Sequence, residues 1–181
     1  MRRTERVKYL KLIAALAWPT IIEQILTTAV SYVDTAMVGA LGKRASATVG
    51  ATMTVNWMLG GVVMAFGIGF LAYIARSIGA GKNEQAKRAA AQSVTVALLT
   101  GLVLTVLALT LARFVPVWMR ADKDIRAGAS EYFFIIYIPM IFRSASITFG
   151  TVIRAAGDTR KPMIVNTVTN LVNVVLNFLL I

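Results

Sequence analysis

The segment SYVDTAMVG, residues 31–39, decides the fold of this chain because it places a carboxylate inside a long apolar run. That run covers residues 12–41 and is interrupted only by Glu23, Gln24, Asp34 and a few hydroxyl side chains. Roughly 20 apolar residues cross the hydrocarbon core of a bilayer, so the run predicts a first membrane-spanning helix. A charged side chain within a span costs at least about 2.5 kcal/mol on insertion scales, and such residues usually mark ion, proton or counter-ion sites. Asp34 is therefore the first candidate for a functional residue.

The composition indicates an integral membrane protein whose first partner is the lipid bilayer. Hydrophobic residues make up 57% of the chain and charged residues 15%, and the mean hydropathy is +0.72. Soluble domains carry about 25% charged residues. The net charge of +11 does not indicate nucleic-acid binding, because Lys and Arg gather in the short segments between apolar runs, as membrane topology requires.

The sequence has neither His nor Cys. Disulfides, thiolate nucleophiles, imidazole bases and the commonest transition-metal ligands are thereby excluded. We therefore predict that the protein is not an enzyme and has no cofactor, apart from a coupling ion.

Five apolar runs predict an all-α, polytopic membrane helix bundle. The approximate spans are residues 12–41, 49–75, 89–112, 132–153 and 162–181. In the second span Gly61, Ala65 and Gly69 recur every four residues, which gives a flat helix face. Such faces usually let a neighbouring backbone approach closely, and a ligand-facing role is the alternative.

Lys and Arg are distributed unevenly between the two ends of these spans. Twelve lie at the amino end and in the turns after the second and fourth spans, and six lie in the turns after the first and third. The positive-inside rule therefore predicts a cytoplasmic amino terminus in a multi-pass protein of the plasma membrane. Because five spans end without a polar tail, we expect a longer protein to continue beyond Ile181.

Two predicted helices carry continuous polar faces. Steps of three and four residues keep side chains on one side of a helix. The first face comprises Glu23, Thr27, Ser31 and Asp34, and the second comprises Asn166, Asn170, Asn173 and Asn177. If the helices enter the bilayer near Trp18 and Lys161, Asp34 and Asn177 both lie about 16 residues, or roughly 24 Å, along their helices, and they could be neighbours.

These faces have two interpretations. A carboxylate with amide and hydroxyl oxygens suits a hard cation such as sodium. The alternative is hydrogen bonding between helices, which contributes about 0.6 kcal/mol per pair in one membrane system. The asparagines alone do not separate the two interpretations, whereas the charge of Asp34 favours function.

Arg143 is an isolated charge in the fourth span, and its possible partners are Glu23 and Asp34. We predict a pair between Glu23 and Arg143 that is structural or gates a pathway. Placement of both residues in a water-filled cavity is the alternative, because paired and cavity-facing charges are the two usual outcomes.

Several motifs, in this order, resemble the multidrug and toxic compound extrusion (MATE) transporters over essentially the whole chain. They are Trp18-Pro19 followed by Gln24, then residues 33–39 with Leu41-Gly42, residues 77–81, residues 154–163, and residues 170–181. The resemblance implies twelve helices in two lobes and export of drugs or metabolites against sodium or protons. Residues 1–181 would then form five helices of a six-helix amino-terminal lobe, and the carboxy-terminal lobe would be a further partner.

The resemblance also implies a cation site. It centres on Asp34, with Asn173 and Asn177 as the matching polar groups. Some proton-coupled members carry aspartate where this chain has Asn177, which favours sodium or a single-carboxylate mechanism. Gln24, Thr27, Ser31 and Asn170 extend the polar surface, while Glu23 and Arg143 lie outside the matched motifs.

The leading hypothesis is a secondary antiporter that exports a small cationic or neutral organic compound. A flippase for lipid-linked precursors and a non-transporting structural subunit are the rivals. A flippase cavity would be ringed by basic residues, and Arg143 is the single cation well inside a predicted span.

Overall fold

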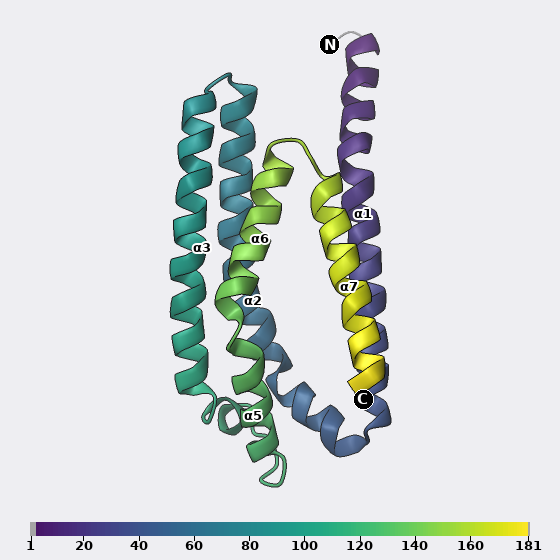
Figure 1. Cartoon of the computed structure of the whole chain (residues 1–181), viewed down its shortest axis with the longest axis vertical. Helices are drawn as coiled ribbons and strands as arrows, with labels where there is room; N and C mark the ends of the chain where they lie inside the picture. The colour runs from purple at the N-terminus through teal and green to yellow at the C-terminus, as the bar shows by residue number, and fades with distance from the viewer. Residues whose placement is uncertain (1–2, 181) are drawn as a thin grey trace.

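The computed structural model describes residues 3–180, and this part of the chain consists of helices and short connections (Figure 1). The side chains of residues 3–6, 8 and 9 lie outside the description, so most of the predicted basic amino end is not tested. The helices are α1 (Arg3–Ala40), α2 (Lys43–Gly79), α3 (Asn83–Leu111), α4 (Val115–Trp118), α5 (Arg126–Tyr137), α6 (Met140–Ala155) and α7 (Arg160–Leu180).

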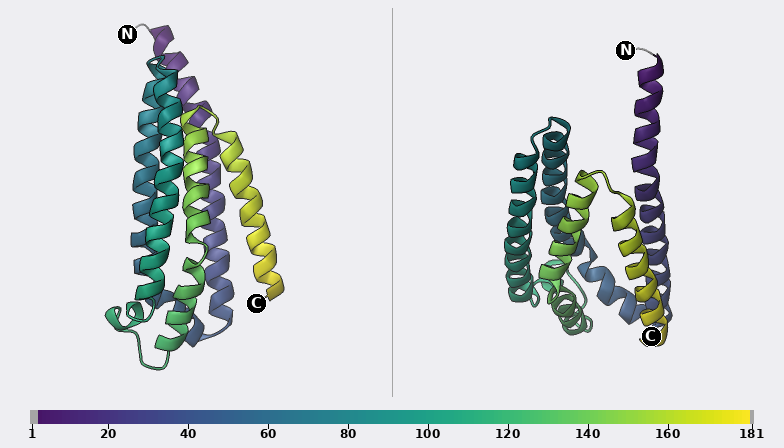
Figure 2. Two further views of the ribbon diagram at one scale, coloured as in Figure 1. Left: turned by 60° about the vertical axis from the view of Figure 1, so that its left-hand side comes forward. Right: turned by 45° about the horizontal axis from the view of Figure 1, so that its top comes forward.

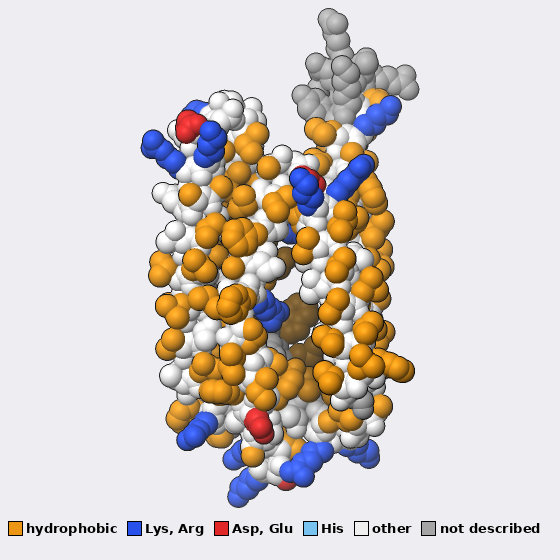
Figure 3. Space-filling model, in the orientation of Figure 1, with side chains coloured by type: hydrophobic (Ala, Val, Ile, Leu, Met, Phe, Trp, Pro, Cys, Tyr) orange, Lys and Arg blue, Asp and Glu red, His pale blue; other side chains and the backbone are white. Residues whose placement is uncertain are grey.

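The helices form two groups. α2, α3, α5 and α6 pack together, and α1 lies beside α7, as the views in Figures 1 and 2 agree. The main apolar core belongs to the first group and includes Val63, Leu104, Phe133, Tyr137 and Met140. In the described part of the chain, α7 has one buried residue, Pro162. The α1–α7 pair therefore makes few apolar contacts with the other group, and a hollow is visible between the two groups in Figure 3.

α3 and α6 approach each other closely at Gly101. A Cβ atom added at Gly101 would lie 2.8 Å from the Cα atom of Ile141. Next to it, the buried Ser144 hydroxyl donates a 2.8 Å hydrogen bond to the Ala97 carbonyl oxygen. Both features require the α3 and α6 backbones to run in contact, as small and hydroxyl residues allow in membrane proteins.

The prediction of an all-α membrane bundle is confirmed. Four described helices are long and apolar enough to cross a bilayer, and α5 with α6 makes a fifth span that is bent by 48°. The bend lies at Pro139, which has no N–H to continue the α5 ladder. Large apolar side chains such as Trp57, Phe142 and Phe178 are exposed, which is unusual for a soluble domain and suits a chain surrounded by lipid.

Helices extend past the predicted spans because backbone hydrogen bonding continues into the polar ends. α2 begins six residues before the predicted second span, and α3 begins at Asn83 rather than at residue 89. Between them Gly81 has a φ of +72°, which glycine adopts without a steric penalty and which turns the chain back.

The predicted packing face of α2 has no partner in the described part of the chain. A Cβ atom added at Gly61 or Gly69 would meet nothing within 4 Å. The close glycine of α2 is instead Gly67, where an added Cβ atom would lie 3.3 Å from the Thr151 hydroxyl oxygen. Ala65 and Gly69 line an open groove of about 800 Å³ between α2 and α3.

The connections between the helices lie at the two ends of the molecule. The amino end of α1, the α2–α3 turn and the α6–α7 loop lie at one end of the molecule in Figure 1. The α1–α2 turn and the α3–α5 connection lie at the other end. Lys and Arg gather mainly at the two ends, and apolar side chains cover the length between them (Figure 3).

Candidate functional site

A polar seam joins α1 to α7. Three side-chain hydrogen bonds cross it, and each joins residues that are 143 positions apart in the chain. A constant separation means that the two helices run parallel and in register, and Figure 1 shows them side by side with the same direction. The α1–α7 seam comprises Glu23, Thr27, Val30 and Asp34 of α1 and Asn166, Asn170, Asn173 and Asn177 of α7. Both sets advance by four, three and four residues, the spacing at which parallel helices keep one face together.

One end of the seam is formed by Asp34, Asn173 and Asn177. The Asn177 amide nitrogen donates to Asp34 Oδ1 at 2.8 Å and to Asn173 Oδ1 at 3.3 Å. A carboxylate oxygen and an amide oxygen therefore converge on one point. The predicted proximity of Asp34 and Asn177 is confirmed, although Asn173 is largely exposed.

The convergence has a chemical consequence. Carboxylate and amide oxygens are the ligands that hard cations prefer, and the two oxygens already approach the same point. Turning the Asn177 amide by 180° would present its oxygen there in place of its nitrogen, and the two orientations are assigned from the hydrogen bonds they make. The residues therefore fit a small cation, with oxygens from three side chains.

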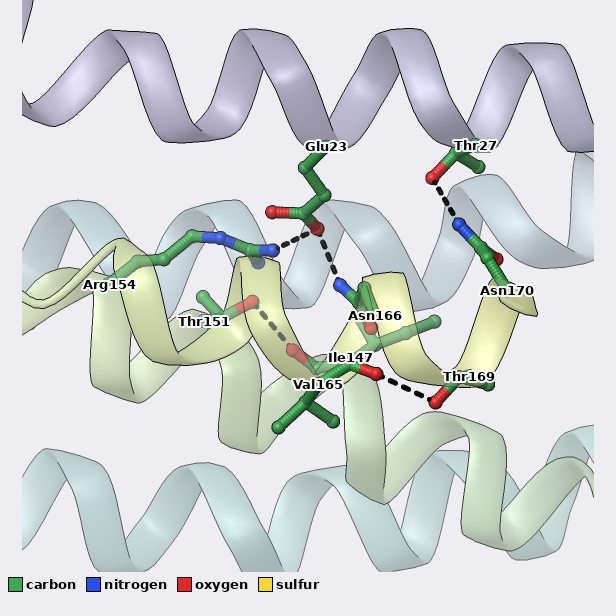
Figure 4. A network of polar contacts seen from close by, with 9 residues as sticks. All are labelled: Glu23, Thr27, Ile147, Thr151, Arg154, Val165, Asn166, Thr169 and Asn170. Carbon is green, nitrogen blue, oxygen red and sulfur yellow. Dashed lines mark hydrogen bonds and ion pairs between the residues drawn. The ribbon is translucent and has the colours of Figure 1, made fainter. Parts of the chain in front are cut away.

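The middle of the seam is a single contact. The Asn170 amide nitrogen donates to the Thr27 hydroxyl oxygen at 3.2 Å (Figure 4). Ser31, which the sequence places on the same face as Thr27, is exposed, and Val30 takes the half-buried position of the seam. Gln24 is exposed as well. The structure thus brings Thr27 and Asn170 together but leaves Ser31 and Gln24 outside the seam.

The opposite end of the seam is an ionic network between three helices. Glu23 Oε1 accepts hydrogen bonds from the Arg154 guanidinium of α6 and from the Asn166 amide of α7, both at 2.5 Å (Figure 4). The side chains of Glu23 and Arg154 are 12% and 21% exposed. Because the pair is largely buried, removing one partner would leave an unpaired charge, at a cost of about 3–5 kcal/mol.

The predicted pair between Glu23 and Arg143 is wrong. Arg143 is exposed on α6, and Arg154 occupies the position beside Glu23. Arg154 and Arg143 are 11 residues, or about three turns, apart on the same helix, which corresponds to roughly 16 Å along its axis. The predicted fourth span ends at residue 153 and so excludes Arg154, whereas α6 continues to Ala155 and carries Arg154 to the depth of Glu23.

Arg154 is accordingly the residue of the network that the sequence did not reveal. The signal that could have found it is helix continuity, since no proline lies between Pro139 and Gly157 and the one glycine between them, Gly150, stays within the helix. α6 continues to Ala155, and Gly157 then turns the chain with a φ of +92°. Arg154 therefore stays helical and faces the neighbouring helices.

A second contact ties α1 to α7 beside this network. The Arg160 guanidinium lies 5.9 Å from the centre of the Trp18 ring. Both side chains are exposed, so the contact contributes about 0.5–1 kcal/mol. It agrees with the register of the seam without burying either group.

The sequence matches the MatE family over residues 19–179. Two proteins named probable multidrug resistance protein NorM are similar to it. The protein from Thermotoga maritima is 32% identical over 166 residues, which is 92% of this chain and 36% of that relative. The protein from Bacillus thuringiensis subsp. konkukian is 28% identical over 176 residues, or 95% of this chain and 38% of that relative.

A solved structure has the same fold. It is described as a MOP superfamily transporter from Pyrococcus furiosus in which the reverse polarity of the binding pocket suggests a different function. The TM-score is 0.88 at 25% identity, over 92% of this chain and 37% of the solved chain. The chain thus spans less than two fifths of the length of the relatives it matches. From the family match over residues 19–179, the chain belongs to the MatE family, within the MOP superfamily of membrane transporters.

Proposed function

We propose that this chain supplies the cation-coupling site of a secondary antiporter, with Asp34 as the cation-binding carboxylate and Asn173 and Asn177 as its polar partners. The cation enters at Asp34, and its release on the other side of the membrane accompanies export of a small organic compound. The observation that supports this proposal is the convergence of the Asp34 and Asn173 oxygens on the Asn177 amide.

Sodium and a proton are both compatible with this site. A sodium ion would take up the converging oxygens, whereas a proton would bind Asp34 alone. Asn177 favours sodium or a single-carboxylate mechanism, since two adjacent carboxylates would favour sharing a proton. The ion is the only cofactor in the proposal.

The proposed substrate is a cationic or neutral drug or metabolite. A flippase for lipid phosphates would need several free basic groups around its cavity. Arg154 is neutralised by Glu23, and Arg143 is the remaining cation well within a span. The NorM names of two relatives support drug export, and the share of those relatives that the chain covers supports a second lobe as partner.

The test is ion-driven efflux of a fluorescent cationic dye from vesicles that contain the complete protein. Sodium and pH gradients are imposed separately. Asp34→Asn keeps the shape of the side chain and can still accept a hydrogen bond from Asn177, so we expect normal insertion with loss of ion-driven efflux. Asp122→Asn is the matched control, because Asp122 is an exposed loop acid. Efflux that persists unchanged in Asp34→Asn would refute the assignment.

A further inference from the structure

We propose that the network of Glu23, Arg154 and Asn166 fixes the axial register between α1 and α7, and so determines which asparagine faces Asp34. The three are positioning residues, since none of them contacts the converging oxygens at Asp34. The effect on cation binding rests on the proposed function, whereas the effect on register does not.

The asparagine repeat cannot set the register alone. In the observed register, residues 143 apart face each other, and Asp34 meets Asn177. If α1 slid by four residues against α6 and α7, which a short loop joins, residues 139 apart would face each other. Asn173 would then face Asp34, and Asn166 would face Thr27. Two of the three polar contacts would therefore survive a slip of one helical turn, about 6 Å along the axis.

Glu23 is the seam residue that distinguishes these registers. After the same slip it would face Pro162, whose side chain offers no hydrogen-bond donor. It would also move away from Arg154, which belongs to α6 and donates to it at 2.5 Å. A largely buried carboxylate cannot lose both donors without a large cost, so the network penalises the slipped register. A buried polar group that specifies register is the best-attested role of such pairs.

The register in turn determines the composition of the cation site. In the observed register Asn177 meets Asp34, and Asn173, one turn earlier on α7, adds a second oxygen. In the slipped register Asn173 would take the place of Asn177. The residue one turn before Asn173 is Thr169, whose hydroxyl donates to the Val165 carbonyl oxygen at 2.9 Å. The amide oxygen of the observed site would have no equivalent there.

Disulfide cross-linking can measure the register directly, because the chain has no native Cys. Cysteines at Thr27 and Asn170 report the observed register, since these side chains are in contact at 3.2 Å. Cysteines at Val30 and Thr169, which are 139 positions apart, report the slipped register. A disulfide requires Cα atoms within about 7 Å, so a slip of one turn separates the two reporters.

The cross-linking experiment uses the complete protein in membranes, in three backgrounds. In the parent and in Arg154→Lys, which keeps the charge, we expect cross-linking of the 27/170 pair and none of the 30/169 pair. The double variant Glu23→Gln with Arg154→Gln removes both charges, so it avoids an unpaired buried ion and should insert normally. In the double variant we expect the 30/169 disulfide to appear. An unchanged pattern in the double variant would overturn the proposal.

Transport by the same variants, without introduced cysteines, tests the consequence for the cation. In the double variant we expect the cation concentration for half-maximal efflux to rise about tenfold, the scale on which outer partners affect bound ions. In Arg154→Lys, which keeps the charge, we expect this concentration to stay near the parent value. Loss of maximal rate with an unchanged half-maximal concentration would indicate a purely structural role. A shifted cross-link pattern together with ion-independent efflux would refute the proposed function and leave the register proposal intact.

Discussion

In the proposed cation site, Asn177 would control what Asp34 binds, because its amide can present either a nitrogen or an oxygen to the same point. As a donor, the nitrogen hydrogen-bonds to Asp34 Oδ1 at 2.8 Å. As an acceptor, the oxygen would complete a cation site with Asn173. A carboxylate at this position could not make that exchange, since an ionised carboxylate only accepts hydrogen bonds.

Asp158 lies in the loop between α6 and α7, outside the predicted spans, and its titration affects the stability of the fold. Its Oδ1 atom accepts hydrogen bonds from the backbone N–H groups of Arg160 and Lys161, at the start of α7. The backbone N–H of Lys161, followed by its ammonium group at 3.0 Å, lowers the pKa of Asp158 below its ordinary value of 3.8. The negative charge also lies at the positive end of the α7 helix dipole.

A lowered pKa means that the stabilisation by Asp158 is fully present above about pH 4, the pKa of the unfolded state, and is lost as the pH falls through the folded-state pKa. We expect Asp158→Ala to lower the melting temperature at pH 7, by an amount that shrinks in acid below pH 4. Intrinsic fluorescence of the purified protein during heating measures this difference. Asp122→Ala is the control, and an equal loss in both variants would contradict the prediction.

At the scale of the helices, Gly101 allows the backbones of α3 and α6 to lie in contact. Because the Cα atom of Ile141 lies 2.8 Å from a Cβ atom at this position, Gly101→Ala must push two backbones apart. We expect a loss of about 1–3 kcal/mol in unfolding free energy, typical of overpacked cores. Gly61→Ala is the matched control, since a Cβ atom there meets nothing within 4 Å. Thermal unfolding in detergent compares the two, and equal stabilities would contradict this account.

The membrane-spanning helices could be predicted from the sequence, because runs of apolar residues mark them. The proximity of Asp34 and Asn177 could be predicted as well. Their depth follows from the apolar runs, and their faces follow from steps of three and four residues. Ser31 was misplaced because three- and four-residue steps both fit a helix face, and only the partner helix selects Val30 instead. Arg154 was missed because its partner lies 131 residues away, and no local pattern encodes that contact.

At the scale of the molecule, one end of the bundle is predicted to face the cytoplasm. This end carries the amino end of α1, the α2–α3 turn and the α6–α7 loop. Single cysteines at Asn83, the first residue of α3, and at Asp122, in the α3–α5 connection, would lie at opposite ends of the bundle. Because basic residues favour the inner side, we expect a membrane-impermeant thiol reagent to label Asp122→Cys in intact cells. Asn83→Cys should react only after permeabilisation, and the reverse pattern would show an inverted orientation.

The parallel pairing of α1 with α7 also has a consequence for synthesis of the protein. Glu23, Thr27 and Asp34 of α1 are each translated 143 residues before their hydrogen-bond partners on α7. At about 5–20 residues per second, that delay is roughly 7–30 s. During this time the helix that carries Glu23 and Asp34 has to be held by the insertion machinery or lie at the bilayer surface. The nascent chain should therefore depend on membrane insertases until α7 has been made.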